Sequence, residues 1–194
     1  KARGLDGRSG GKFLHPGPGF GGSCLPKDLR ALAEVGRRVG EPLELIQAVS
    51  RVNERQRARM VEKVAAAVGD VAGKTLAVLG LAFKPNTDDI REAPSLDLIR
   101  GLLERGARVR AFDPAAMPNA ARVLPAVEYC KDAYDAASGA DGVVLVTEWN
   151  QFRNLDLGRL KAALRQPVFV DLRNVYEPSR MREAGFRYTG VGRA

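Results

Sequence analysis

The sequence has few of the residues that build a disulfide framework, and it has no long hydrophobic run. Its two cysteines, Cys24 and Cys130, lie in very different sequence contexts. A disulfide framework is therefore not expected, and a reducing, cytoplasmic location is the natural assumption. No apolar run approaches the about 20 residues that a transmembrane helix needs, so we expect no membrane-spanning segment.

Aromatic residues are also scarce, at 6% of the chain, although the formal net charge of +8 is strongly basic. A basic balance often indicates a polyanionic partner such as nucleic acid. Here the arginines are scattered rather than clustered, and no nucleic-acid-binding motif is present. We therefore expect no nucleic-acid partner, because small phosphorylated ligands or plain solubility explain the charge better.

The chain has no initiator Met and no apolar signal core behind its first charged residues. We therefore expect it to begin within a longer protein. Its 194 residues, of which 45% are hydrophobic, are enough for one large or two small domains with a buried core.

The first part of the chain, residues 1–72, predicts a loop followed by two helices. Its beginning is rich in Gly and Pro, which favour a loop. Pro26 suits the first turn of a helix that ends at Gly36 or Gly40. A second helix is expected over residues 42–69.

Apolar residues recur at spacings of three and four along the helix expected over residues 42–69. This apolar stripe consists of Leu45, Val49, Val52, Met60 and Val64. Such a stripe predicts either packing into a core or a seam between two copies of the chain. We expect a homodimer formed through this helix.

From residue 73 onward, short apolar runs alternate with helical segments. Strands are expected at residues 75–80, 108–113, 127–130, 143–147 and 168–171, and helices near 95–104, 115–123, 131–138, 159–165 and 178–184. This alternation is typical of a parallel sheet covered by helices on both faces. Residues 73–194 are therefore predicted to form one Rossmann-like α/β domain, whose ligand would bind beyond the carboxyl ends of the strands.

A glycine-rich segment precedes the first helix and contains a G-x-G-x-x-G match at Gly17, Gly19 and Gly22. No strand precedes this match, and no acidic residue follows it at the spacing of a βαβ unit, so it does not predict a dinucleotide site. The glycines indicate either a close approach of the backbone to a ligand or merely a tight turn.

Cys24 follows the glycine-rich segment, just before Pro26 at the expected start of a helix. The positive end of the helix dipole and Lys27 both favour a thiolate there. Asp28 adds a carboxylate that can hold a water or accept a proton. The alternative is a buried, inert cysteine, which is the expectation for Cys130 at the end of a short strand.

Two long motifs span residues 13–28 (FLHPGPGFGGSCLPKD) and 80–95 (GLAFKPNTDDIREAPS). Shorter ones are Val52-Asn-Glu-Arg-Gln56, Thr147-Glu-Trp149, Asp171-Leu-Arg173-Asn and Gly185-Phe-Arg-Tyr188. In order and spelling these motifs resemble the nucleotide-sugar dehydrogenase family over nearly the whole chain. The two long motifs look most like the UDP-glucose enzymes of that family, and UDP-N-acetylmannosamine enzymes are a close alternative.

The resemblance implies a two-step oxidation of a primary alcohol on the sugar to a carboxylate, with NAD as the oxidant. UDP-glucose would become UDP-glucuronate through a thiohemiacetal and then a thioester on Cys24. Asp28 matches the carboxylate that assists proton transfer or hydrolysis. Cys24, Lys27 and Arg91 match residues that face the cofactor.

The resemblance also implies a UDP-sugar site. Its substrate-binding positions are Arg8, Phe13, Leu14, His15, Gly17, Gly19, Phe20, Gly21, Phe83, Lys84 and Arg173. Arg8 matches a residue that reaches across a dimer, while Lys84 and Arg173 follow strand ends, where a phosphate ligand is expected. The side chain of His15 itself is expected to be exposed. The family usually has Gly where this chain has Leu172, which predicts crowding at the nucleotide.

The family's NAD-binding fingerprint and its catalytic Lys–Asn pair belong to an N-terminal half that this sequence does not contain. We therefore expect NAD to be bound mostly outside this chain, no metal to be involved, and the chain alone to be inactive. The alternatives are a fragment of another nucleotide-sugar dehydrogenase, or a non-catalytic module for UDP-sugar binding and dimerisation.

Overall fold

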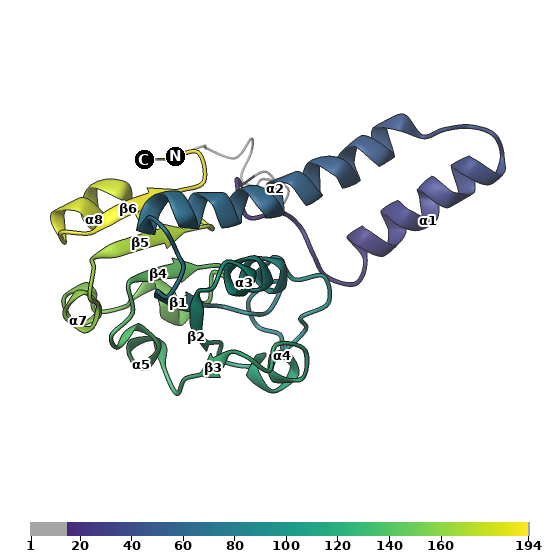
Figure 1. The fold of residues 1–194 in the computed structure, drawn as a ribbon. Coiled ribbons are helices and arrows are strands. Elements are labelled where there is room, and N and C mark those ends of the chain that lie inside the picture. The colour runs from purple at the N-terminus through teal and green to yellow at the C-terminus, as the bar shows by residue number, and fades with distance from the viewer. Residues whose placement is uncertain (1–14, 194) are drawn as a thin grey trace.

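The computed structural model describes residues 15–193. Two long helices come first, and strands alternate with shorter helices after them (Figure 1). The elements are α1 (Leu25–Arg38), α2 (Glu44–Val68), β1 (Thr75–Leu79), α3 (Pro94–Glu104), β2 (Arg108–Phe112), α4 (Met117–Val123), β3 (Glu128–Tyr129), α5 (Ala133–Ala137), β4 (Gly142–Leu145), α6 (Asn150–Arg153), α7 (Leu157–Ala163), β5 (Val168–Asp171), α8 (Pro178–Glu183) and β6 (Arg187–Gly190).

Helices α1 and α2 form a hairpin whose closed end projects away from the sheet (Figure 1). Helix α1 starts with Pro26 in its first turn, where the missing N–H of proline costs nothing. It ends shortly before Gly40, and α2 ends directly before Gly69. Both glycines have positive φ, at 77° and 80°, a conformation in which a side chain would be strained. Gly36, the other expected end of the first helix, lies inside α1.

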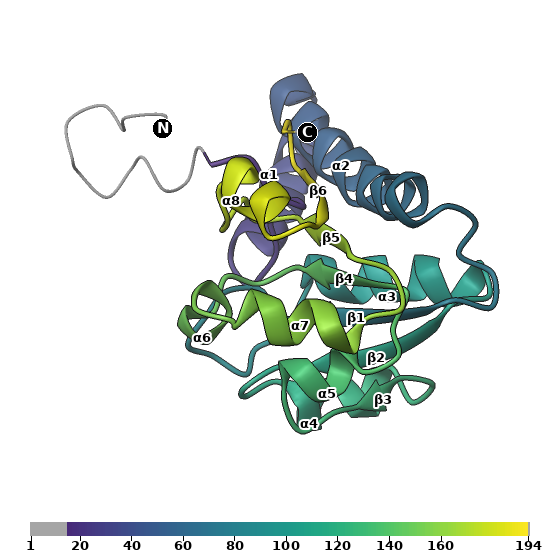
Figure 2. The same ribbon diagram turned by 90° about the vertical axis from the view of Figure 1, so that its left-hand side faces the viewer.

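The six strands form one parallel sheet in the order β3-β2-β1-β4-β5-β6. On one side β1 pairs with β2, Leu76 lying opposite Val109, and on the other it pairs with β4, Leu76 lying opposite Gly142. Helices α2 and α3 lie on one face of the sheet, and α5 and α7 lie on the other (Figure 2). The predicted α/β fold is confirmed, and because the strand order reverses between β1 and β4, the ligand crevice is expected at their carboxyl ends.

The apolar stripe of α2 divides between two environments. Met60 and Val64, in the second half of the helix, are buried in the hydrophobic core with the central strands. Leu45 and Val52, in the first half, remain 80% and 54% exposed. One helix therefore belongs both to the core and to the projecting hairpin, and the predicted domain boundary after residue 72 stays a prediction.

Two elements were not expected from the sequence. Strand β6 lies at the edge of the sheet and alternates exposed and buried residues, so it gives no continuous apolar run. Helix α6 is a single turn with one buried side chain, Phe152. Among the residues that the structure describes, none of the helices is long and apolar enough to cross a membrane.

Candidate active site

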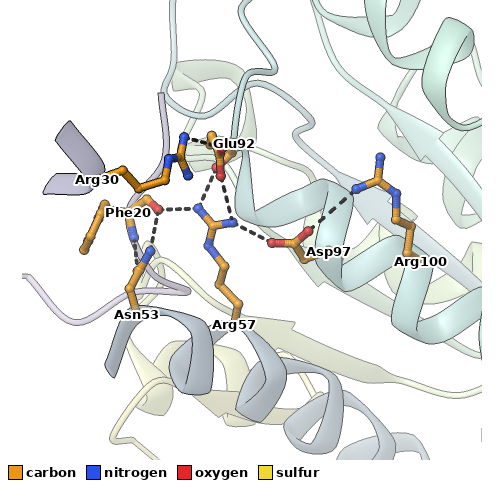
Figure 3. A network of polar contacts seen from close by, with 7 residues as sticks. All are labelled: Phe20, Arg30, Asn53, Arg57, Glu92, Asp97 and Arg100. Atoms are coloured by element: carbon orange, nitrogen blue, oxygen red, sulfur yellow. Dashed lines mark hydrogen bonds and ion pairs between the residues drawn. The ribbon is translucent and has the colours of Figure 1, made fainter. Parts of the chain in front are cut away.

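Polar side chains of α2 hold the glycine-rich segment from one side. The Asn53 side chain accepts a hydrogen bond from the Phe20 amide at 2.8 Å and donates one to the Phe20 carbonyl at 3.1 Å (Figure 3). The Gln56 amide donates to the carbonyl of Gly17 at 2.8 Å. The backbone of this segment is therefore fixed against the middle of α2.

The opposite side of the segment packs against residues that follow β1. A Cβ on Gly22 would lie 2.7 Å from the ring of Phe83, and one on Gly21 would overlap the carbonyl oxygen of Glu92. The Gly22 amide donates a 2.9 Å hydrogen bond to the Arg91 carbonyl. At these positions glycine permits close contact between two backbones, in agreement with the conclusion that the G-x-G-x-x-G match is not a dinucleotide loop.

Arg173 lies beyond the carboxyl end of β5 and also reaches the glycine-rich segment. Its guanidinium forms a two-bond ion pair with Glu148, which follows β4, and Nη2 donates at 2.8 Å. The nearest atom to a Cβ on Gly17 would be Nη1 of Arg173, at 3.1 Å. Leu172 is fully buried in the core. Its side chain therefore lies in the core and not on the surface, and the crowding expected at this position stays a prediction.

Phe83 and Lys84 follow β1 at the point where the strand order reverses. The Lys84 ammonium is exposed and lies 5.2 Å from the centroid of the Phe83 ring. The loop that carries them is held from below, because Ser95 donates to the Leu81 carbonyl at 2.5 Å and Thr147 to the Ala82 carbonyl at 2.6 Å. The exposed ammonium of Lys84 therefore lies on a loop held by hydrogen bonds, at the carboxyl ends of the strands, where a ligand is predicted to bind.

A buried carboxylate at the end of β2 supports the same loop. Asp113 accepts hydrogen bonds from the amides of Leu81 and Ala82 at 2.7 and 3.1 Å. Its second oxygen, Oδ1, accepts from the amides of Ala115 and Ala116, and the Trp149 indole donates to the first, Oδ2, at 3.0 Å. In dinucleotide-binding sheets an acidic residue in this region binds a ribose hydroxyl. Here the carboxylate is wholly engaged by the protein itself.

Cys24 is exposed and directly precedes the first residue of α1. The neighbouring Lys27 forms a 3.0 Å ion pair with Asp28. That hydrogen bond raises the pKa of Lys27, and the Cys24 thiolate adds a smaller contribution in the same direction. The Asp89 carboxylate raises the pKa of Arg91, to which Cys24 again adds a smaller part. Two cations thus lie near the thiol.

Cys130 lies in a different environment, because its thiol is buried whereas that of Cys24 is exposed. It is buried at the end of β3, and burial raises its pKa, an effect that the charge of Arg110 offsets only in part. Its burial agrees with the sequence, and its lack of reactivity stays a prediction.

The structure brings most of the predicted site residues together at one edge of the sheet. Gly17 to Gly22 lie between α2, Phe83 and Arg173, with Cys24 following them. His15 is exposed. Arg8, Phe13 and Leu14 lie outside the described residues. Among residues 15–193, no group of three or more His, Cys, Asp or Glu residues could hold a metal ion.

Sequence reasoning missed the residues that hold the site in place. Asn53 and Gln56 were visible as polar interruptions of the apolar stripe, and Glu148 stood within a quoted motif. Asp113 gave no signal beyond its position after a strand.

Comparison with known proteins connects this geometry to a family. Residues 77–178 match a family model described as the UDP binding domain of the UDP-glucose/GDP-mannose dehydrogenase family, and residues 1–55 match its central domain. The chain belongs to the UDP-glucose/GDP-mannose dehydrogenase family. The central-domain match contains the glycine-rich segment and Cys24, and the UDP-binding match contains Phe83, Lys84 and Arg173.

Three relatives in this family are 42–47% identical to the chain over the aligned residues. UDP-glucose 6-dehydrogenase of Rhizobium meliloti (strain 1021) is 47% identical over 98% of the chain and 44% of the relative. TuaD, a UDP-glucose 6-dehydrogenase of Bacillus subtilis (strain 168), is 46% identical over 98% of the chain and 41% of the relative. The solved UDP-glucose dehydrogenase of Pyrobaculum islandicum is 42% identical with a TM-score of 0.84, over 98% of the chain and 42% of that structure. The chain thus spans less than half of these proteins.

We predict that alkylation distinguishes the two thiols. Iodoacetamide at pH 7.5 should modify Cys24 at least about tenfold faster than Cys130, because only Cys24 is exposed and close to cations. Mass spectrometry of peptides from a time course would measure both rates. A Cys24→Ser variant should retain only the slow reaction. Faster modification of Cys130 would contradict the assignment of Cys24 as the reactive thiol.

We also predict a pH-dependent contribution from the Glu148–Arg173 ion pair. Burial raises the pKa of Glu148, but the hydrogen bonds and charge of Arg173 outweigh it, so the pKa falls below the ordinary value of 4.5. Stability from such a depressed pKa is present above the ordinary value and disappears as pH falls through the folded-state pKa. Glu148→Gln should lower the free energy of unfolding by about 1–3 kcal/mol at pH 7 and by much less at pH 3.

Urea unfolding at the two pH values would measure this difference. Glu128→Gln is the matched control, because Glu128 pairs with Arg110 but is mostly exposed, so its removal should cost at most about 1 kcal/mol. An equal loss for Glu148→Gln at pH 7 and pH 3 would show that the ion pair is not the source of the effect.

Proposed function

We propose that this chain is the substrate-binding half of an NAD-dependent UDP-glucose 6-dehydrogenase, which converts UDP-glucose to UDP-glucuronate. The observation that carries the proposal is the packing of the Cys24 segment directly onto Phe83 and Arg173. An exposed thiol and the nucleotide-binding edge of a doubly wound sheet are thereby placed side by side. The sequence relationship to proteins named UDP-glucose 6-dehydrogenase supports the same choice.

The binding site proposed for UDP lies at the carboxyl ends of β1 and β5. Lys84 is exposed there and supplies positive charge for the diphosphate. Arg173 uses Nε and Nη2 in its ion pair with Glu148, and within residues 15–193 its Nη1 atom, next to Gly17, is left to meet a polar group of the ligand. The backbone of residues 17–21, which carries no side-chain bulk at its glycines, would lie along the sugar nucleotide.

The chemistry proposed for Cys24 is covalent catalysis. Oxidation of the sugar's primary alcohol gives an aldehyde, and the thiolate adds to its carbonyl carbon to form a thiohemiacetal. Loss of a hydride from this adduct leaves a thioester. Water then cleaves the carbon–sulfur bond, which releases the carboxylate and the free thiol. Asp28, one turn into α1, is suited to accept a proton from that water.

NAD is the oxidant that the family implies, and two NAD molecules would each take up one of the two hydrides. The sheet of this chain does not fit a dinucleotide, because Asp113 is consumed by internal hydrogen bonds and residues 80–93 form a long loop in place of a tight glycine turn after β1. We therefore propose that NAD is held mostly by another domain, with Cys24, Lys27 and Arg91 facing it. NADH formation by this chain alone would contradict this part of the proposal.

A UDP-N-acetylmannosamine dehydrogenase is the nearest alternative enzyme. The solved UDP-D-ManNAc dehydrogenase of Pyrococcus horikoshii is 29% identical with a TM-score of 0.77, below both values for the Pyrobaculum islandicum protein. A non-catalytic UDP-sugar module would share the fold but would have no use for an exposed thiol beside the binding edge.

We predict that the chain binds UDP and UDP-glucose and does not bind GDP-mannose. Isothermal titration would compare these ligands with UDP-N-acetylmannosamine, for which weaker binding is expected than for UDP-glucose. Arg173→Met should weaken UDP-glucose binding at least about tenfold, because a charge-assisted contact to the ligand is lost. Arg108→Met is the control, since Arg108 is the first residue of β2 and so lies at the amino ends of the strands, opposite the proposed site. Equal affinity for all four ligands, or for none, would refute the substrate assignment.

We further propose that the chain forms a homodimer through the helical hairpin. Its support is the row of exposed apolar side chains on α1 and the first half of α2. These are Leu25, Leu32, Val35, Leu45, Val49 and Val52. Monomeric proteins seldom expose so many large apolar groups on one helical hairpin, because covering them gains about 25 cal/mol for each Å².

The dimer is tested by one charge placed on this surface. Leu45→Glu should raise the dimer dissociation constant at least about tenfold, since a carboxylate would have to be desolvated in the seam. Sedimentation velocity at several concentrations would measure the change. Val123→Glu, which alters a 44% exposed valine on α4, should leave the dissociation constant unchanged. A monomeric wild-type chain at all concentrations would overturn the proposal.

A further inference from the structure

Arg57 stands in the middle of α2 and is nearly buried, with 12% of its side chain exposed. Its Nη2 atom donates two hydrogen bonds, to the carbonyl of Phe20 at 2.6 Å and to the carbonyl of Glu92 at 2.8 Å. Its Nη1 atom donates to the Asp97 carboxylate at 2.6 Å and lies 3.8 Å from the Glu92 carboxylate (Figure 3). One guanidinium thus contacts three separate segments of the chain.

Each of these segments bears on the proposed site. Phe20 belongs to the glycine-rich segment that leads to Cys24. Glu92 ends the loop that carries Phe83, Lys84 and Arg91, and Asp97 lies in the first turn of α3. Arg57 therefore joins the thiol-bearing segment to the loop proposed to bind the nucleotide.

At its contact with Arg57, Glu92 adopts an unfavourable backbone conformation. Glu92 has a φ of 53°, a left-handed conformation that costs energy for a residue with a side chain. This conformation coexists with the hydrogen bond from its carbonyl to Arg57 and with the ion pair of its carboxylate with Arg30, at 3.0 Å. Strained backbone of this kind persists where its surroundings hold it in place.

The geometry requires arginine rather than any cation. Two nitrogens of a planar guanidinium are needed to reach two carbonyls and one carboxylate, and the single nitrogen of lysine cannot reproduce this fork. The Nε atom of Arg57 is buried, and within the described part of the chain it has no hydrogen-bond partner. The side chain is thus placed so that its two terminal nitrogens donate hydrogen bonds, while Nε donates none to the described residues.

We propose that Arg57 is a positioning residue that sets the distance between the glycine-rich segment and the loop of residues 83–92. Within residues 15–193, Arg57 makes no hydrogen bond or ion pair with Cys24, Lys84 or Arg173, and it acts through the carbonyls of Phe20 and Glu92. Its effect on ligand binding rests on the proposed function, whereas its effect on the segment itself does not.

The test compares Arg57→Gln and Arg57→Lys with Arg105→Gln in the full 194-residue chain. Arg105 also ties α3 to α2, through an ion pair with Glu62, but it does not touch the glycine-rich segment. Hydrogen–deuterium exchange of peptides covering residues 17–24 reports the order of the segment. Titration with UDP-glucose measures the affinity of the proposed binding site for this ligand.

Both Arg57 variants should speed exchange in residues 17–24 at least about tenfold and weaken UDP-glucose binding by a similar factor, whereas Arg105→Gln should change neither more than about twofold. Wild-type exchange in Arg57→Lys would overturn the proposal, because charge alone would then suffice. The proposal also fails if exchange in this segment rises equally in Arg105→Gln. If Arg57→Gln does not fold, Arg57→Lys decides. If the wild-type chain does not bind UDP-glucose, the proposed function fails, and exchange alone judges the role of Arg57.

Discussion

The placement of the whole site depends on the burial of the second half of α2 against the sheet. Met60, Val61, Val64 and Val68 are buried there, and each such side chain contributes about 1.5–3 kcal/mol. Single hydrogen bonds contribute about 1 kcal/mol net, so packing and not polar contact fixes where this helix lies. Because the helix is continuous, the turns that precede this buried half hold Asn53, Gln56 and Arg57 in a defined place near the carboxyl ends of the strands. The glycine-rich segment, and with it Cys24, takes its position from them.

Buried carboxylates at the strand ends complete this arrangement. Asp113 after β2 and Asp171 at the end of β5 are both fully buried, and both accept hydrogen bonds from backbone amides of the loops that follow. Burial raises the pKa of Asp171, although bonds from Tyr176, Arg173 and Tyr188 oppose this rise. A carboxylate that accepts several N–H and O–H bonds fixes a loop more firmly than apolar contact can, since its acceptors have defined directions. The loops at the carboxyl ends of these strands are therefore held in place by hydrogen bonds.

The sequence was sufficient for most of the fold because its signals are local. Apolar runs such as residues 143–147 predict central strands, and glycines such as Gly40 and Gly69 mark helix ends. Strand β6 escaped because an edge strand exposes alternate residues. The residues that hold the site in place were not predicted, for a different reason. Partners such as Arg57 and Glu92 are 35 residues apart, and a contact at that separation has no periodic signature in a single sequence. Glu148 and Arg173 are similarly separated, by 25 residues.

The strand order of this sheet is the one found in dinucleotide-binding domains, yet the side chains at its ligand edge are arranged otherwise. Dinucleotide binding uses a tight glycine turn after the first strand and a free carboxylate after the second. Here the first turn is a long loop bearing Phe83 and Lys84, and Asp113 has no acceptor capacity left for a ribose. Phe83 and Arg173, which follow two of the strands, are instead in contact with a segment from outside the sheet, the one that bears Cys24. Fold alone would have suggested a dinucleotide, and the occupied Asp113 carboxylate is the feature that argues against one at this site.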